Sequence, residues 1–232
     1  MRLVFASMLI AACVAATFGQ VRRPVVWDED IDELTGEDAV SPPPQNAILF
    51  AGSSTIRLWT TLDRDMAPLP VINRGFGGSR SWELLYYMDR IVLPYKPAII
   101  VYYEGGNDVA YGVGAAEIAD NFRTFTERVA AAFPNIQIFF MSIIKAPENR
   151  DLWSVVDEAN GRVRQYSEGR KNVGYIDLNR VVFDKAGEPR VELYLPDRLH
   201  FNVAGYAELT KIVRPIIEKA WQQSSLKRRD HE

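Results

Sequence analysis

The chain has 232 residues, of which 47% are hydrophobic and 25% are charged, and its formal net charge is −3. This length and composition suit one domain with a sizeable core. Because the charge balance is only mildly acidic, the chain has no electrostatic reason to bind nucleic acid or an anionic membrane surface, and we expect neither as a partner.

The N-terminal residues have the pattern of a targeting segment. Arg2 precedes an almost wholly apolar run from Leu3 to Phe18, which is shorter than the roughly 20 residues that span a bilayer. We therefore interpret residues 1–20 as a secretory signal peptide and expect export, to the periplasm or the medium, without an integral membrane span. Cys13 ends an Ile-Ala-Ala-Cys sequence that resembles a lipoprotein lipobox, so a lipid anchor at Cys13 is the alternative to release.

Since Cys13 is the only cysteine, we expect no disulfide, no cysteine nucleophile and no cysteine-built metal site in the mature protein.

Residues 21–45 form an acidic and proline-rich segment that we interpret as a tether. Seven of the eleven residues from Asp28 to Asp38 are Asp or Glu, and three prolines follow Ser41. Dense like charge is typical of a solvated segment, and consecutive prolines favour a stiff, extended chain. Three large apolar residues could still fold the segment back onto the domain: Trp27, Ile31 and Leu34.

From residue 47 onward, short apolar runs alternate with longer helical patterns. The apolar runs predict strands at residues 47–51, 71–73, 98–103, 136–142 and 174–178. The helical patterns lie at 53–61, 81–93, 115–132 and 152–168, with a last helix from about 203 to 222 that Asn202 would cap. Several runs are apolar on both faces, as buried parallel strands are. We therefore predict one α/β domain at residues 46–224, with a parallel sheet and helices on both faces, and a short tail at 225–232.

Chemically useful residues follow the predicted strands, where ligands bind in an open α/β sheet. Gly-Ser-Ser-Thr follows the first strand and includes Ser54, whereas a glycine-rich turn with Gly78 follows the second. Asn107 comes after the third strand, and Asp197 and His200 precede the last helix. The sequence therefore predicts that a hydroxyl, a glycine-rich turn, an amide and an Asp/His pair meet at one rim.

This combination suits acyl transfer. A serine hydroxyl becomes a good nucleophile when an imidazole takes its proton, and a carboxylate on the other ring nitrogen orients that imidazole. The backbone N–H groups of Ser54 and Gly78 and the side-chain N–H of Asn107 could hold the oxyanion. His200 is the candidate base because the only other histidine, His231, lies in the tail. Two histidines, one of them in a tail, also argue against a zinc site, and we expect no metal.

The four blocks resemble those of the SGNH hydrolases, also called GDSL esterases/lipases, a family named for Ser, Gly, Asn and His. On that resemblance Ser54 is the nucleophile, with Gly78, Asn107 and the Asp197/His200 pair in their family positions. Ser54, His200 and Asp197 would then form the catalytic triad. Ser53 stands where the family usually has Asp, a position outside this triad. The resemblance implies a three-layer α/β/α flavodoxin-like sandwich with a five-stranded parallel sheet of order 2-1-3-4-5. It also implies hydrolysis of esters or thioesters with no cofactor.

Each block alone also has a structural explanation. The Gly-Ser-Ser-Thr sequence is typical of a helix N-cap, with Ser53 as the cap, and Asn107 with Asp108 is typical of a turn. Because all four blocks occur in order, we favour a carboxylester hydrolase with a serine acyl-enzyme, acting on a short-chain or acetyl ester such as an acetylated carbohydrate. The alternatives are a lysophospholipase or thioesterase, a sugar O-acyltransferase, and a non-catalytic ligand-binding protein. The expected partner is thus a small-molecule, glycan or lipid ester, and the sequence assigns no oligomeric state.

Overall fold

The structure is a computed structural model that describes residue 23 and residues 25–229. Its centre is a five-stranded parallel sheet of order β2-β1-β3-β4-β5, which confirms the predicted sheet and strand order. The strands are β1 Ile48–Gly52, β2 Val71–Gly75, β3 Ile99–Tyr103, β4 Gln137–Met141 and β5 Val173–Ile176. Each begins and ends within two residues of its predicted bounds.

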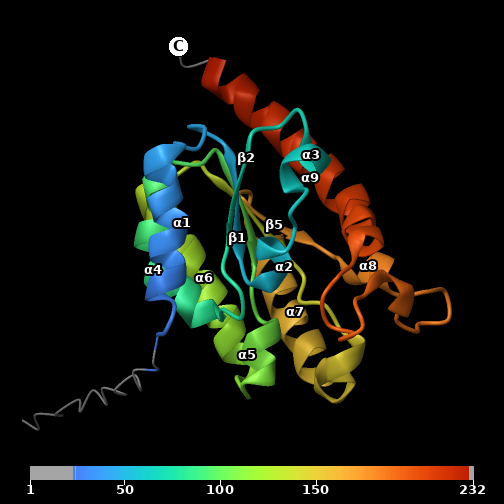
Figure 1. The fold of residues 1–232 in the computed structure, drawn as a ribbon. Coiled ribbons are helices and arrows are strands. Elements are labelled where there is room, and N and C mark those ends of the chain that lie inside the picture. The colour runs from blue at the N-terminus through green and yellow to red at the C-terminus, as the bar shows by residue number, and fades with distance from the viewer. Residues whose placement is uncertain (1–22, 24, 230–232) are drawn as a thin grey trace, which may run out of the picture.

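Alternate residues of the strands enter two separate apolar cores, one on each face of the sheet. In β1, Leu49 and Ala51 pack into one core, and Ile48 and Phe50 pack into the other. The first core lies under α4 (Ser81–Ile91), α6 (Ala115–Ala132) and α7 (Trp153–Glu168). The second lies under α2 (Ser54–Arg57), α3 (Leu62–Met66), α8 (Asn179–Val182) and α9 (Val203–Arg229). These layers, visible in Figure 1, confirm the predicted α/β/α sandwich.

The long helices match their predicted positions better than the short ones do. The last helix begins at Val203 as expected, and Asn202 caps it by accepting the N–H of Gly205 at 3.1 Å. It continues to Arg229, so the predicted end near residue 222 is too early. The predicted helix at 53–61 is wrong in its length, because the chain forms α2 and then α3. The structure also has α5 (Gly106–Ala110), α8 and three 3-10 turns, at Leu93–Tyr95, Pro147–Leu152 and Val191–Leu193, all too short for periodicity to reveal.

The acidic segment is a helix packed against the domain, so the prediction of a tether is wrong for its larger part. Helix α1 spans Asp28–Val40 and lies along α4. Ile31 is fully buried in the first core, and Trp27 and Leu34 pack against that core. The carboxylate of Asp38 pairs with Arg74 of β2 and also accepts the hydroxyl of Tyr95. The fold-back alternative is therefore confirmed.

Several expectations concern residues outside the described part of the chain. The predicted signal peptide at 1–20, the lipobox at Cys13 and the tail residue His231 all lie there. Among the residues that are described, no helix is both long and apolar enough to cross a membrane.

Candidate active site

Three neighbouring strands, β2, β1 and β3, end in register at one edge of the sheet. Gly52, the last residue of β1, pairs with Gly75 of β2 on one side and with Tyr103 of β3 on the other. The segments that follow these strands therefore leave the sheet at the same rim, where α/β folds bind their ligands. This register brings the predicted Ser54, Gly78 and Asn107 blocks to one place.

Ser54, His200 and Asp197 form a continuous hydrogen-bonded chain at this rim. His200 Nε2 lies 3.0 Å from Ser54 Oγ, and His200 Nδ1 lies 2.7 Å from Asp197 Oδ2. The imidazole thus contacts a hydroxyl with one nitrogen and a carboxylate with the other, as nucleophilic catalysis requires. Ser54, and not the neighbouring Ser53, makes the contact to His200.

A tight loop explains how two residues only three apart can face each other. Asp197 Oδ1 accepts the backbone N–H groups of Leu199 and His200, each at 3.0 Å. An antiparallel bridge between Tyr194 and Phe201 closes the loop. The hydrogen bond from the His200 side chain, followed by the two backbone N–H groups, lowers the pKa of Asp197 to about 2. Asp197 therefore stays ionised and holds the imidazole in one orientation.

Ser54 opens the short helix α2, which is fastened to the sheet by side chains from other elements. Asn73 of β2 donates its amide N–H to Ile56 O at 2.7 Å, and its amide oxygen accepts the N–H of Gly75 at 2.9 Å. From α9, the Tyr206 hydroxyl donates to Thr55 O at 3.0 Å. Ser53 occupies the N-cap position of α2, but its side chain makes no capping hydrogen bond. The prediction that Ser53 is the N-cap residue is thus correct in position, but the expected hydrogen bond from its side chain to the helix is absent.

The glycine-rich turn after β2 is a loop from Phe76 to Ser79, which we call the Gly78 loop. Gly78 has φ +80°, a backbone conformation that favours glycine. Asn107, in the first turn of α5, donates one amide N–H to Ser79 O at 2.8 Å. On another side, Trp27 packs so closely that a Cβ on Gly78 would lie 3.1 Å from its ring. Contacts from α5 and from the residue before α1 therefore hold this loop.

Three buried carboxyl groups, which we call the acid cluster, lie behind the Gly78 loop. Glu83, Glu104 and Asp108 are each at most 1% exposed. Ser79 Oγ lies 2.7 Å from Glu104 Oε1. Asp108 accepts both the backbone N–H and the hydroxyl of Ser81. Sequence reasoning gave Glu104 no role, and its position next to the Asn107 block was the only available signal.

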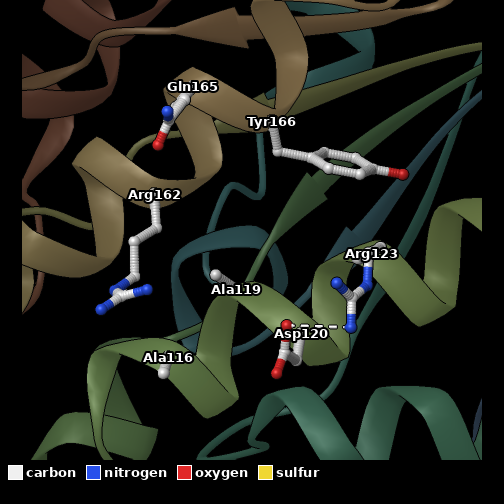
Figure 2. Close-up of a pocket in the computed structure, with 7 residues that line it drawn as sticks. All are labelled: Ala116, Ala119, Asp120, Arg123, Arg162, Gln165 and Tyr166. Atoms are coloured by element: carbon white, nitrogen blue, oxygen red, sulfur yellow. Dashed lines mark ion pairs between the residues drawn. The ribbon is translucent and has the colours of Figure 1, made fainter.

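The site is open to solvent and lies apart from two surface cavities among the described residues. The side chains of His200 and Asp197 are 28% and 47% exposed. Figure 2 shows a surface cavity of about 210 Å³ between α6 and α7, where Arg123 pairs with Asp120. A second cavity, of about 220 Å³, lies beside the edge strand β2. Neither includes a triad residue, and the part of the chain that is described has no group of three or more His, Cys, Asp or Glu placed to hold a metal.

Known proteins similar to this chain are found as a family model and as solved structures. The model of a family described as GDSL-like Lipase/Acylhydrolase matches residues 49–208. No curated protein sequence matches the chain significantly.

Solved structures share the fold at low sequence identity. A GDSL-like lipase from Bacteroides thetaiotaomicron has a TM-score of 0.71 at 21% identity, covering 82% of this chain and 98% of its own. A lipase/acylhydrolase from Enterococcus faecalis has a TM-score of 0.61 at 21% identity, with 75% and 96% covered. A family 3 carbohydrate esterase from Clostridium thermocellum has a TM-score of 0.62 at 16% identity, with 78% and 100% covered.

Proposed function

The chain belongs to the GDSL-like lipase/acylhydrolase family, and we propose that it hydrolyses carboxylic esters through an acyl-enzyme formed on Ser54. Membership of the family makes the chain an ester-hydrolysing enzyme. The observation that carries the assignment of residues is the chain of contacts from Ser54 Oγ through His200 to Asp197, at 3.0 and 2.7 Å.

The geometry supports a two-step acyl transfer. Ser54 Oγ attacks the ester carbonyl carbon while His200 Nε2 takes the hydroxyl proton, and the proton then passes to the departing alcohol as the C–O bond breaks. A water molecule next attacks the acyl-enzyme, gives a proton to His200 and releases the acid, and the proton returns to Ser54. Asp197 orients the imidazole and stabilises its charged form throughout. In both steps the backbone N–H groups of Ser54 and Gly78 and the free amide N–H of Asn107 hold the oxyanion.

We propose a short-chain or acetyl ester, such as an acetylated carbohydrate, as the substrate. The partly exposed side chains of His200 and Asp197 support this choice, because an open site admits a bulky alcohol group such as a sugar. Structural neighbours include a carbohydrate esterase and an acetyl esterase, although at 15–16% identity they support the fold more than the substrate. A lysophospholipase or thioesterase would instead prefer long acyl chains, so rates on acetyl and long-chain esters separate these alternatives.

The decisive experiment uses two neighbouring serines that differ in their contact to His200. We expect Ser54→Ala to lower kcat on a short-chain p-nitrophenyl ester on the order of 10³-fold or more, because the nucleophile is lost. Ser53→Ala is the matched control and should keep most of the activity, since its side chain neither contacts His200 nor caps α2. A fluorophosphonate probe should label the parent and Ser53→Ala but not Ser54→Ala. Equal rates for Ser54→Ala and the parent would end the proposal.

Two alternatives of another class share the scaffold. A non-catalytic binding protein has no activated serine, so a failure of the fluorophosphonate to label any serine would favour it. A sugar O-acyltransferase uses the same residues, and product analysis with a sugar acceptor present would reveal it. We also propose that residues 1–20 direct export, with a lipid anchor at Cys13 as the alternative, and N-terminal sequencing and mass of the exported protein distinguish the two.

A further inference from the structure

The Ser79 hydroxyl lies between two oxygen atoms that both accept hydrogen bonds. Ser79 Oγ is 2.9 Å from Phe76 O and 2.7 Å from Glu104 Oε1, and the side chain is fully buried. A hydroxyl carries one hydrogen and can donate to only one of these oxygens. If Ser79 donates to Phe76 O, its contact with Glu104 is a hydrogen bond only when Glu104 itself carries a proton.

The surroundings of Glu104 differ from those of the other two carboxyl groups in the acid cluster. Glu83 accepts the backbone N–H of Arg80 and lies beside its guanidinium, and Asp108 accepts the N–H and hydroxyl of Ser81. Glu104 is 1% exposed, and its Oε2 is buried without a hydrogen-bond partner among the described residues. A buried anion with so few donors is unfavourable, whereas a neutral acid tolerates this environment far better.

Burial and the neighbouring carboxyl groups favour the neutral form of Glu104. Burial raises the pKa of Glu104 well above its ordinary value, and Asp108 on α5 and Glu83 on α4 raise it further. Arg80 and the Ser79 hydrogen bond lower that pKa but do not compensate for burial. Burial also raises the pKa of Asp108, to about 6, and raises that of Tyr102 on β3. Of Glu104 and Asp108, Asp108 is therefore the carboxyl group that is mostly ionised at neutral pH.

We propose that Glu104 is an uncharged carboxylic acid that donates its proton to Ser79 Oγ and thereby positions the Gly78 loop for oxyanion binding. Ser79 Oγ then donates to Phe76 O, so one chain of hydrogen bonds closes the loop on itself. Asn107 fixes the carbonyl of the same serine. The role in catalysis rests on the proposed function, but the protonation of Glu104 does not.

This arrangement predicts a defined pH dependence. When Glu104 loses its proton, Ser79 must turn its hydrogen toward the new carboxylate, and Phe76 O loses its donor. The loop is then held less firmly, so kcat should fall as the pH rises through the pKa of Glu104. Glu104→Gln is nearly isosteric and donates an N–H without titrating, so it should keep kcat within about threefold at neutral pH and remove that alkaline decline. Glu104→Ala, which offers no donor, should lose on the order of tenfold in kcat with little change in KM.

Asp108→Asn provides the contrasting variant within the acid cluster. Asp108 accepts two donors from Ser81, and an amide in its place would turn an N–H toward one of them. We therefore expect Asp108→Asn to destabilise the protein and Glu104→Gln to be tolerated. The reverse result would place the proton on Asp108 and overturn the proposal.

A second measurement is independent of activity and can be made in the Ser54→Ala protein. The folded protein keeps the Glu104 proton, whereas the unfolded chain releases it above a pKa of about 4.3, so raising the pH favours unfolding. The measured quantity is the ratio of two unfolding equilibrium constants, that of the parent over that of Glu104→Gln. Above about pH 4.3 this ratio should rise by up to about tenfold per pH unit. Glu127→Gln, which removes an exposed carboxyl from α6, is the control. Infrared difference spectra of parent and Glu104→Gln should also show the C=O band of a protonated acid.

Each outcome of this measurement decides between protonated and ionised Glu104. A pH-independent ratio together with an absent acid band would show that Glu104 is ionised, and the proposal would fail even if Ser54 proved to be the nucleophile. If Ser54→Ala stayed active while the acid band appeared, the proposed function would fail and the protonated Glu104 would stand.

Discussion

At the residue scale, Asn107 has two tasks that its two amide hydrogens can divide. One N–H donates to Ser79 O at 2.8 Å and so helps to hold the Gly78 loop. The other is free to meet the oxyanion that forms on the substrate. That Ser54, His200 and Asp197 meet could be predicted from sequence, because each follows a strand or precedes the last helix. The choice between Ser53 and Ser54 needed either the family resemblance or the contact to His200.

Replacing Asn107 should therefore affect the transition state more than substrate binding. We expect Asn107→Ala to lower kcat roughly 10²-fold and to change KM by no more than about threefold. Asn107→Asp should lose at least as much, because a carboxylate offers no donor and repels the oxyanion. The exposed Asn135→Ala is the control. Steady-state kinetics on an acetyl ester provide the measurement, and a change confined to KM would contradict the assignment.

At the scale of the element, α1 shows where sequence reasoning failed and why. Its seven acidic residues favoured a solvated tether, yet Trp27, Ile31 and Leu34 recur at helical spacing and mark one apolar face. Acidic residues in the first turn also suit the helix dipole. The early end of α2 and the short helices α5 and α8 could not be predicted from periodicity, since tertiary contacts such as Asn73 to Ile56 O help to define such segments.

The ion pair between Asp38 of α1 and Arg74 of β2 should contribute more to the free energy of unfolding than an exposed pair does. The Arg74 side chain is 8% exposed and that of Asp38 21% exposed, so removing the carboxylate leaves a mostly buried guanidinium without its partner. We expect Asp38→Asn to lower the free energy of unfolding by about 2 kcal/mol. Asp30→Asn makes the same change of charge at an exposed position on α1 and should cost far less. Urea unfolding of both variants checks this, and equal midpoints would argue against a stabilising pair.

At the scale of the whole molecule, the alternation of strands and helices was enough to predict one parallel sheet between two helical layers. Buried strands and long amphipathic helices carry strong periodic signals, and the regular pattern from β1 to α9 leaves few arrangements. The extent of the folded unit was harder to predict, because it depends on tertiary contacts made by α1. Ile31 fills part of the first core, and Trp27 packs against Gly78 of the loop that we propose holds the oxyanion.

We therefore predict that the stable unit begins near residue 23 and not at residue 46. A chain that lacks residues 1–22 should match the full chain in stability and kcat. A chain that lacks residues 1–44 should lose the burial of Ile31 and the partner of Arg74, which together contribute roughly 4 kcal/mol. Its Tm should fall by about 10 °C, and its kcat should fall because the Trp27 contact to the Gly78 loop is gone. Thermal unfolding and ester turnover of the two truncated proteins provide the comparison. If both melted at the same temperature, α1 would be dispensable and the boundary near residue 46 would be correct.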